Sequence, residues 1–280
     1  MAEEKKQTCQ LCSFRNPKGT ATAVILMDNK LLLLKRKQEP YKGRWDLPGG
    51  FMKEGETPEE TIRREISEEL EVEIIGLIPL RPILGTHEWQ GEIFPVLSHF
   101  FLVEIKEKSQ IKLNEESSEF SWISLKEINP GEVFPDSNRK MVLWLKERFI
   151  FDINQLKELV KQLDSSAEIR EYSIYRAILN GYIAKKYDGE ELIGMGWIFP
   201  RQTLLRKQAV VEDMIVDEAY RGKGYGWAIL QDLINWAREN GIEVIELTSH
   251  PKRVAANELY KKAGFQLHET NHYLYRIDKE

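Results

Sequence analysis

The sequence of 280 residues contains only two cysteines, Cys9 and Cys12. Two thiols cannot build the disulfide framework on which small secreted domains depend. No apolar run approaches the roughly 20 residues of a membrane-spanning helix, and the first residues lack the apolar core of a secretory signal. These absences exclude a disulfide-stapled fold, and we expect a soluble, cytoplasmic protein with no membrane partner.

An excess of charge of either sign is also missing. The 40 basic and 45 acidic side chains leave a net charge of −5, which gives no electrostatic reason to expect nucleic acid or an anionic membrane as a partner. Hydrophobic residues make up 42% of the chain. This share is enough for packed cores, so a disordered chain is excluded as the main interpretation.

The length favours two domains rather than one, and the pattern of the chain changes near residue 150. Residues 1–150 alternate strands with a glycine-rich loop and an acidic helix. Residues 151–280 begin with two helices, continue through a hairpin at Asp188-Gly189 to a second glycine-rich turn, and end in a predicted strand over 273–277. Both halves therefore predict a mixed α/β (α+β) fold.

The helix of the first half is predicted over residues 57–70. Thr57 can act as its N-cap and Pro58 as its first residue, and Glu60 completes a capping box. Apolar residues at i, i+4 spacing form a stripe that can dock on a core, namely Ile62, Ile66 and Leu70. The sequence therefore predicts a capped helix with one buried face.

Three glutamates of this helix fall at i, i+3 and i+4, so they project from one face: Glu65, Glu68 and Glu69. Like charges at that spacing repel each other. A hard divalent cation such as Mg²⁺ or Mn²⁺, which prefers oxygen ligands, makes the arrangement favourable. A solvated acidic helix is the alternative on charge alone.

The spacing of these residues resembles the Nudix box, G-x5-E-x7-R-E-U-x-E-E-x-G-U, in which U is aliphatic. The matching positions are Gly50, Glu56, Arg64, Glu65, Ile66, Glu68, Glu69 and Val72. Glu71 stands where the family has a glycine, so we expect a different local turn there. The resemblance implies a Nudix α/β/α sandwich over residues 1–150.

The same resemblance implies hydrolysis of a nucleoside diphosphate linked to another moiety. By position, the metal ligands would be Glu65, Glu68, Glu69 and the Gly49 carbonyl, and Glu56 would pair with Arg64. Glu69 or a glutamate from a later loop would orient the attacking water. Among the loop candidates Glu115, Glu116 and Glu119, we favour Glu119 as the catalytic residue.

The substrate is expected to be ADP-ribose-like or a nucleotide sugar, with a nucleoside triphosphate as the alternative. Residues 9–17 resemble half of the zinc ribbon that precedes some Nudix domains. A zinc ribbon needs four ligands, whereas Cys9 and Cys12 supply two, so we interpret them as a vestigial knuckle with free thiols. The histidines show no metal-ligand spacing and are interpreted as core or surface residues: His87, His99, His250, His268 and His272.

A second glycine-rich turn, Arg221-Gly222-Lys223-Gly224-Tyr225-Gly226, lies between a predicted strand and the long helix. Free N–H groups at such a helix start can hold a pyrophosphate, although an ordinary tight connection explains the turn equally well. The pattern R-x-x-G-x-G, together with Asn257 to Phe265, resembles the GNAT acetyltransferases. The resemblance implies a GNAT mixed-sheet domain over 151–280 that takes acetyl-CoA as cosubstrate.

In that family an amine attacks the thioester directly. The resemblance implies that the backbone of residues 221–226 holds the pyrophosphate and that Met214, Ile215 and Val216 pair with pantetheine. Tyr260 would protonate the departing thiolate, with packing beside Phe265 as its alternative role. Glu212 or Asp213 would act as base, and Asn257 would contact the cofactor.

The two halves together predict a bifunctional enzyme, a metal-dependent hydrolase joined to an N-acetyltransferase. An alternative keeps the hydrolase and makes the GNAT half a CoA-sensing or partner-binding module. Two non-catalytic modules are a third interpretation, against which the intact acidic pattern argues. The expected partners are a nucleotide, acetyl-CoA and an amine whose identity the sequence leaves open, as it does the oligomeric state.

Overall fold

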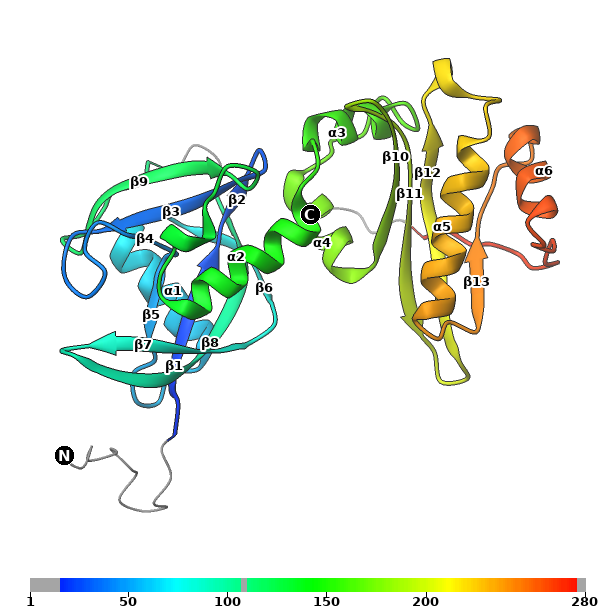
Figure 1. The fold of residues 1–280 in the computed structure, drawn as a ribbon. Coiled ribbons are helices and arrows are strands. Elements are labelled where there is room, and N and C mark those ends of the chain that lie inside the picture. Colours follow the sequence, from blue (N-terminus) through cyan, green and yellow to red (C-terminus); the bar gives the residue numbers. More distant parts are fainter. Residues whose placement is uncertain (1–15, 107–109, 276–280) are drawn as a thin grey trace, which may run out of the picture. The chain divides into compact units, whose positions relative to one another are not determined.

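A computed structural model of the chain describes residues 16–106 and 110–275, and Figure 1 shows its strands and helices. Cys9 and Cys12 lie outside the described residues. The chain divides into two compact units, and the division is not a single cut in the sequence. Residues 155–167, which include most of helix α3 (Ile153–Lys161), belong to the second unit, whereas residues 168–178 of helix α4 (Glu171–Asn180) and its approach belong to the first.

The first unit contains one mixed sheet and one antiparallel sheet. The mixed sheet has the strand order β5-β1-β8-β6, with β7 also paired to β8; the antiparallel sheet has the order β2-β3-β4, with β9 paired to β3. Their bounds are β1 (Lys18–Val24), β2 (Leu26–Met27), β3 (Lys30–Arg36), β4 (Trp45–Asp46), β5 (Gly49–Phe51), β6 (Ile74–Pro79), β7 (Ile83–Trp89), β8 (Glu92–Ile105) and β9 (Ser117–Ser124).

Two helices pack on strands of the mixed sheet. Helix α1 (Pro58–Leu70) packs on β1 and β5, and helix α2 (Asp136–Phe149) packs on β7, after a short 3₁₀ helix, η1 (Pro130–Glu132). The apolar stripe of α1 is fully buried against Leu32 and Phe101, which confirms the predicted docking face of Ile62, Ile66 and Leu70. This docking fixes the orientation of the acidic residues on the same helix.

The ends of α1 follow local chemistry. Thr57 and Glu60 form the predicted capping box, with Pro58 at the first helical position. At the other end, Glu71 has a φ of 52° and a ψ of 38°, the left-handed conformation that glycine most often supplies after a helix. The expectation of a different turn is therefore wrong. The glutamate adopts the backbone conformation that favours glycine, and its carboxylate pairs with Lys112 Nζ at 2.9 Å.

Helix α4 packs within the first unit through one buried tyrosine. Tyr175 is 1% exposed, and its ring lies edge-on to Phe149 at 5.5 Å. Its hydroxyl contacts Glu171, and the backbone N–H of Asn29 donates to the same hydroxyl at 3.2 Å. The segment is therefore part of the core of the first unit, although it comes after residue 154 in the chain.

The second unit has one four-stranded sheet, in the order β10-β11-β12-β13. Its elements are β10 (Tyr182–Asp188), β11 (Glu191–Gln202), β12 (Lys207–Val216), η2 (Glu218–Tyr220), α5 (Tyr225–Glu239), β13 (Val244–Leu247) and α6 (Val254–Lys262). Helix α5 packs on β10, β11 and β12, and its residues Ile229 and Leu233 are buried against Ile198. The antiparallel hairpins and the parallel β12–β13 pair make this sheet mixed.

The predicted final strand is not seen in the residues that the structure describes. Residues 273–275 have no strand conformation, and their side chains are at least 75% exposed. A strand is stable only when a neighbour pairs with its backbone groups, and no described strand pairs with them. Within the described ranges, none of the helices combines the length and the apolar character that crossing a membrane requires.

The burial of Tyr175 leads to a testable prediction about the first unit. Tyr175→Ala is expected to lower the free energy of unfolding by about 3 to 5 kcal/mol, because it removes a buried aromatic side chain and leaves a cavity. Urea denaturation followed by circular dichroism measures this loss. Tyr187→Ala, at a tyrosine that is 42% exposed, serves as the control. An equal and small effect of both substitutions would show that α4 does not belong to the core of the first unit.

Candidate active sites

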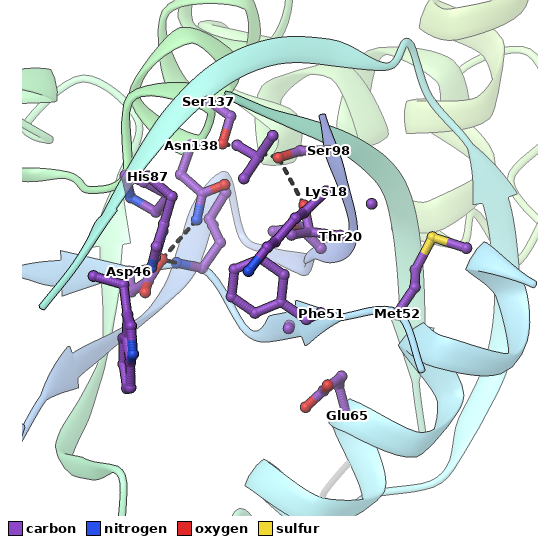
Figure 2. A pocket seen from close by; sticks show the side chains of 18 of the residues that line it. Lys18, Thr20, Asp46, Phe51, Met52, Glu65, His87, Ser98, Ser137 and Asn138 are labelled. Carbon is purple, nitrogen blue, oxygen red and sulfur yellow. Dashed lines mark hydrogen bonds between the residues drawn. The ribbon is translucent and has the colours of Figure 1, made fainter. Parts of the chain in front are cut away.

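The first unit contains a cavity of about 850 Å³. Its lining comes from β1, β5, the carboxylate face of α1, the β7–β8 hairpin and the start of α2. Figure 2 draws Glu65 at the lower end of this pocket, with Ser98, Ser137 and Asn138 at the upper end. The pocket therefore has an acidic end and a neutral polar end.

Two glycines allow the acidic end to form. Gly49 has a φ of +145°, and a Cβ at this position would lie 2.3 Å from the carbonyl oxygen of Ala21. A Cβ on Gly50 would lie 2.3 Å from Glu65 Oε1. The backbone N–H of Gly49 donates to Glu69 Oε2 at 2.8 Å. A side chain at Gly49 would therefore collide with the backbone of β1, and one at Gly50 would collide with the carboxylate of Glu65.

Two acidic side chains at this end are largely withdrawn from water: Glu65, which lines the pocket, and Glu69, which accepts a hydrogen bond from Gly49. Glu69 is 8% exposed, and burial raises its pKa well above the usual range, although the hydrogen bond from Gly49 opposes the rise. Burial also raises the pKa of Glu65, and the nearby charge of Glu116 contributes to the rise in both residues. Such a group of buried anions is favourable only when positive charge lies among them.

Arg64 supplies part of that positive charge. It donates from Nε to Glu56 Oε1 at 2.7 Å, from Nη1 to Glu65 Oε1 at 2.7 Å and from Nη1 to Glu68 Oε2 at 3.2 Å. The predicted pairing of Glu56 with Arg64 is confirmed, and these hydrogen bonds lower the pKa of Glu56 to about 2. The arginine thus holds the loop to the helix and occupies one oxygen each of Glu65 and Glu68.

The donor set fits a hard divalent cation. Three carboxylates and the neighbouring carbonyl of Gly49 are the oxygen ligands that Mg²⁺ and Mn²⁺ prefer. Within residues 16–106 and 110–275, however, no three acidic, histidine or cysteine side chains are close enough to hold an ion as they stand. Since Arg64 engages Glu65 and Glu68, a bound ion would require these side chains to turn.

The structure gives different surroundings to Glu116 and to Glu119, the loop glutamate that the sequence analysis favours. Glu119 lies on β9 opposite Lys35 of β3, and its Oε1 is 2.8 Å from Lys35 Nζ in an exposed ion pair. Glu119 does not line the pocket, whereas Glu116 does. The cross-strand register decides the difference, because it places Glu119 beside a lysine of the neighbouring strand.

The upper end of the pocket contains groups that sequence reasoning missed. Asp46 accepts hydrogen bonds from Arg36 Nη1 at 3.0 Å and from Asn138 Nδ2 at 2.6 Å. Asp46 lies on β4, directly before the glycine loop, and Asn138 is in the first turn of α2. The Asp46 position is within the approach to the Nudix box, but no local signal in the sequence relates it to Asn138.

His87 is the second pocket residue that the sequence does not reveal, because its pattern predicts only a core or surface histidine. It lines the pocket between three aromatic rings, with centroid distances of 5.6 Å to Tyr41, 5.4 Å to Phe51 and 5.7 Å to Phe94. Burial lowers its pKa to about 4, and the charges of Arg36 and Lys18 act in the same direction. His87 is therefore a neutral, partly apolar wall of the pocket at pH 7.

The second unit places the predicted glycine-rich turn at the start of α5. Gly222 and Gly224 have φ values of +78° and +88°, and a Cβ would meet nothing within 4 Å at either position. Gly224 is the N-cap of α5, and it has no side chain to hydrogen-bond the first N–H groups of the helix. Tyr225 and Gly226 begin the helix, so their backbone N–H groups lie where an anion would be favoured.

The two basic side chains of this turn are engaged with other groups. Arg221 donates from Nε to the carbonyl of Val216 at 3.2 Å and from Nη1 to Glu218 at 3.4 Å. Lys223 Nζ lies 4.8 Å from the ring centroid of Tyr220. Both side chains therefore contact neighbouring groups of the protein, although the Arg221 side chain is still 54% exposed.

Strand β12 leads into this turn and changes its pairing on the way. Its parallel pairing with β13 ends at Val211, so among the described strands residues 212–216 pair only with β11. The β11–β12 register shifts at Met195–Trp197, opposite Asp213, whose φ is 50°. Residues 214–216 are the expected pantetheine partners, and they lie on the part of β12 that has lost its β13 neighbour.

The remaining predicted residues lie around this open part of β12. Tyr260 Oη is 4.0 Å from Met214 Sδ, and the Tyr260 ring lies edge-on to Phe265 at 6.1 Å. Burial raises the pKa of Tyr260 and also the pKa of Glu212. Asn257 donates to the carbonyls of His250 and Arg253, so its amide nitrogen holds the start of α6.

Both units are mixed α/β domains with a candidate ligand site, and the sequence profiles of two enzyme families match them. The NUDIX domain profile matches residues 17–145, and the profile of the Acetyltransferase (GNAT) family matches residues 148–265. These matches confirm both family resemblances. The chain is a NUDIX domain followed by a GNAT-family acetyltransferase domain.

Relatives of each domain are found separately. An ADP-ribose pyrophosphatase from Methanocaldococcus jannaschii is 45% identical over 75 residues, which are 26% of this chain and 41% of the relative. An uncharacterized N-acetyltransferase from Bacillus subtilis is 33% identical over 89 residues, 32% of this chain and 34% of the relative. A MutT NUDIX hydrolase structure from Burkholderia pseudomallei is 24% identical with a TM-score of 0.39, covering 46% of this chain and 97% of its own. The chain thus spans less than half the length of these two curated relatives.

The environment of His87 leads to a prediction about pH. A buried neutral histidine takes up its proton more readily in the unfolded chain, where its pKa is about 6.5. The free energy of unfolding should therefore fall as the pH decreases from about 6.5 towards about 4. His87→Phe, which keeps a ring between Phe51 and Phe94, should remove this part of the fall. Urea denaturation of both proteins at several pH values checks the difference, and parallel pH curves for the two proteins would contradict it.

Proposed function

We propose that the first domain hydrolyses the diphosphate linkage of a nucleoside diphosphate derivative. The observation that carries this proposal is the approach of the Gly49-Gly50 backbone to the buried carboxylates of Glu65 and Glu69, at one end of a pocket large enough for a nucleotide. An ADP-ribose-like substrate or a nucleotide sugar is the first candidate, which the relative named ADP-ribose pyrophosphatase supports. A nucleoside triphosphate is the second candidate.

The carboxylates of Glu65, Glu68 and Glu69, with the Gly49 carbonyl, would hold Mg²⁺ or Mn²⁺. When bound, the ion neutralises negative charge on the phosphoryl oxygens. The raised pKa values of Glu65 and Glu69 fit this role, because a cation offsets the unfavourable burial of two anions. Glu56 and Arg64 act as positioning residues that hold the loop against α1.

The pocket favours Glu116 over Glu119 as the loop carboxylate that orients the attacking water and accepts its proton. Glu116 lines the pocket, and its charge acts on both Glu65 and Glu69. Glu119 is bound to Lys35 at an exposed position outside the pocket. A general base must reach the water that it activates, so we assign this role to Glu116.

For the second domain we propose transfer of an acetyl group from acetyl-CoA to an amine. The N–H groups at the start of α5 would hold the pyrophosphate, and Met214, Ile215 and Val216 would pair with pantetheine along the open edge of β12. Tyr260, next to Met214, would give its proton to the departing thiolate. Its raised pKa fits a group that is protonated before the step.

Glu212 is the proposed base that accepts the proton of the amine, acting directly or through water, because burial raises its pKa. The amide nitrogen of Asn257 is hydrogen-bonded to the carbonyls of His250 and Arg253 at the start of α6. Its side-chain oxygen would therefore make the contact with the cofactor. The alternative is a domain that binds acetyl-CoA as a sensor without transferring the acetyl group. Transfer assays with a panel of amines separate the two, since a sensor binds acetyl-CoA but acetylates none of them.

The glutamate assignments predict a pattern of activities. With Mg²⁺ and a panel of nucleoside diphosphate derivatives, Glu69→Gln and Glu116→Gln should each lower kcat by about 100-fold or more, the typical contribution of such a group. Glu119→Gln should leave kcat within about twofold, because it loses only an exposed ion pair. Product mass and phosphate release identify the bond that is cleaved.

Glu119→Gln is the matched control for Glu116→Gln, since both remove one carboxylate from the same segment. A loss confined to Glu119→Gln would reverse the assignment of the base. Wild-type hydrolysis by Glu69→Gln would contradict the carboxylate site as a whole. Circular dichroism of each variant separates loss of activity from loss of folding.

The start of α5 predicts the effect of an added charge. Gly224→Glu should weaken acetyl-CoA binding by about tenfold or more, because a carboxylate beside the pyrophosphate adds like-charge repulsion, and about 1.4 kcal/mol is enough for a factor of ten. Gly189→Glu is the matched control, since Gly189 also has a positive φ, with nothing within 4 Å of its Cβ, in the hairpin turn between β10 and β11. Calorimetric titration measures both affinities. Equal affinities would contradict the proposed phosphate site.

A further inference from the structure

The sheet of the second unit carries a pair of stacked aromatic rings on the face that is turned away from helix α5. Helix α5 runs along the other face (Figure 1), where Ile198 of β11 and its cross-strand partner Val211 of β12 pack against it. Because successive side chains of a strand point to opposite faces, Trp197 and Phe199 lie on the face away from α5. Their ring centroids are 4.5 Å apart with 28° between the ring planes, and both residues are partly exposed. We call Trp197 and Phe199 the aromatic strip.

The register of the sheet places the proposed base beside this strip. Glu212 of β12 is the direct cross-strand partner of Trp197, and Val210 is the partner of Phe199. Directly opposed residues of an antiparallel pair share one face of the sheet, and their Cβ atoms are about 5 Å apart. Glu212 therefore lies on the same face as the aromatic strip, next to its Trp197 end.

The surroundings of Glu212 favour a positively charged ligand group. Burial raises the pKa of Glu212 and the negative charge of the adjacent Asp213 raises it further, whereas the charge of His272 acts in the opposite direction. Two neighbouring carboxylates that are partly withdrawn from water are stabilised by a cation. An alkylamine carries a positive charge at pH 7, since its pKa resembles that of lysine, about 10.4. The Glu212 end of the strip is therefore suited to an ammonium group.

The opposite end of the strip is polar, but its charges are already paired. Arg201 and Gln208 are the next cross-strand pair on this face. Arg201 forms an ion pair with Glu246 and donates to Gln208 Oε1 at 3.1 Å, and Gln208 Nε2 donates to Glu246 Oε1 at 3.1 Å. Because Arg201 and Glu246 neutralise each other, this end does not call for a second charged group in the ligand.

We propose that the acetyl acceptor of the second domain is an amine that a short spacer joins to an aromatic ring. The ammonium group lies at Glu212, and the ring of the acceptor packs on the aromatic strip. Aromatic rings prefer stacked or edge-on neighbours, so a third ring extends the pair that the strand already presents. The inference rests on the proposed transferase function and names the class of amine that this function leaves open.

The transfer step uses the groups already assigned. The nitrogen of the neutral amine forms a bond to the acetyl carbon, and the carbon–sulfur bond of the thioester breaks. The proton that leaves the nitrogen passes to Glu212, and the departing thiolate takes a proton from Tyr260. The products are an N-acetylated aromatic amine and CoA.

The test compares two amines of equal charge and chain length. 2-Phenylethylamine has a flat aromatic ring, whereas 2-cyclohexylethylamine has a saturated ring of six carbons with no π face. The wild-type protein should acetylate the phenyl compound with a kcat/KM about three- to tenfold higher, the range that aromatic packing contributes. Phe199→Leu, which keeps an apolar side chain without a ring, should bring this ratio close to one. The change should come through the KM of the phenyl compound, because Glu212 and Tyr260 are retained.

Trp236→Leu is the matched control. It removes one ring from the stacked pair of Tyr182 and Trp236, whose centroids are 6.1 Å apart and which pack with the core on the α5 face. This variant should keep the wild-type ratio between the two amines. Circular dichroism and the affinity for acetyl-CoA show whether either variant has lost its fold.

Binding separates this inference from the transferase proposal. Calorimetry of both amines with protein saturated with CoA needs no turnover. A preference for the phenyl compound that Phe199→Leu abolishes would support the inference even if no acetyl group is transferred. Equal or weaker binding and acetylation of the phenyl compound would overturn it, as would a ratio that Phe199→Leu leaves unchanged, or a wild-type protein that binds neither amine.

Discussion

The first domain depends on the close approach of a glycine backbone to buried carboxylates. The backbone N–H of Gly49 donates a hydrogen bond to Glu69. Gly50 has no Cβ, and this leaves room for Glu65, because a Cβ at position 50 would lie 2.3 Å from the Glu65 carboxylate. The docking of Ile62, Ile66 and Leu70 on the core fixes the helix that carries these acids. Because the helix cannot rotate without exposing this stripe, Glu65 stays on the lining of the pocket and Glu69 stays hydrogen-bonded to Gly49, despite the repulsion between the two acids.

The two proposed sites would hold negatively charged ligands in two different ways. The NUDIX domain gathers acidic side chains, which would attract a phosphate only through a cation bound among them. In the GNAT domain the proposed site consists of backbone N–H groups at the start of α5, where Gly224 provides no side-chain cap. An added carboxylate is therefore expected to be harmful at the second proposed site, whereas carboxylates are the proposed metal ligands of the first. The predicted domain boundary near residue 150 stays a proposal. Helix α4 follows that boundary in the chain, but most of it packs with the first unit.

Local patterns predicted much of both sites. The capping box, the buried stripe, the pairing of Glu56 with Arg64 and the glycine turn before α5 depend on residues close together in the chain, so spacing was sufficient. Prediction was wrong at Glu71, where the left-handed turn forms without glycine, and at residues 273–275, which have no strand partner among the described residues. The choice between Glu116 and Glu119 stays a proposal, because spacing alone does not show which glutamate a lysine on the adjacent strand will bind.

The sequence by itself indicated the two families through the resemblance of two motifs, and it located the acidic helix face and the glycine-rich turn, since each of these features depends on one short segment. Only the tertiary structure decided which distant groups share the pocket. Asp46 and Asn138 are 92 residues apart, and Thr20 and Ser98 are 78 apart. Their contacts follow from strand register and from the packing of α2, which no local pattern encodes. Strand pairing and packing also place His87 in the lining of the pocket, although no pattern in the sequence indicates this position.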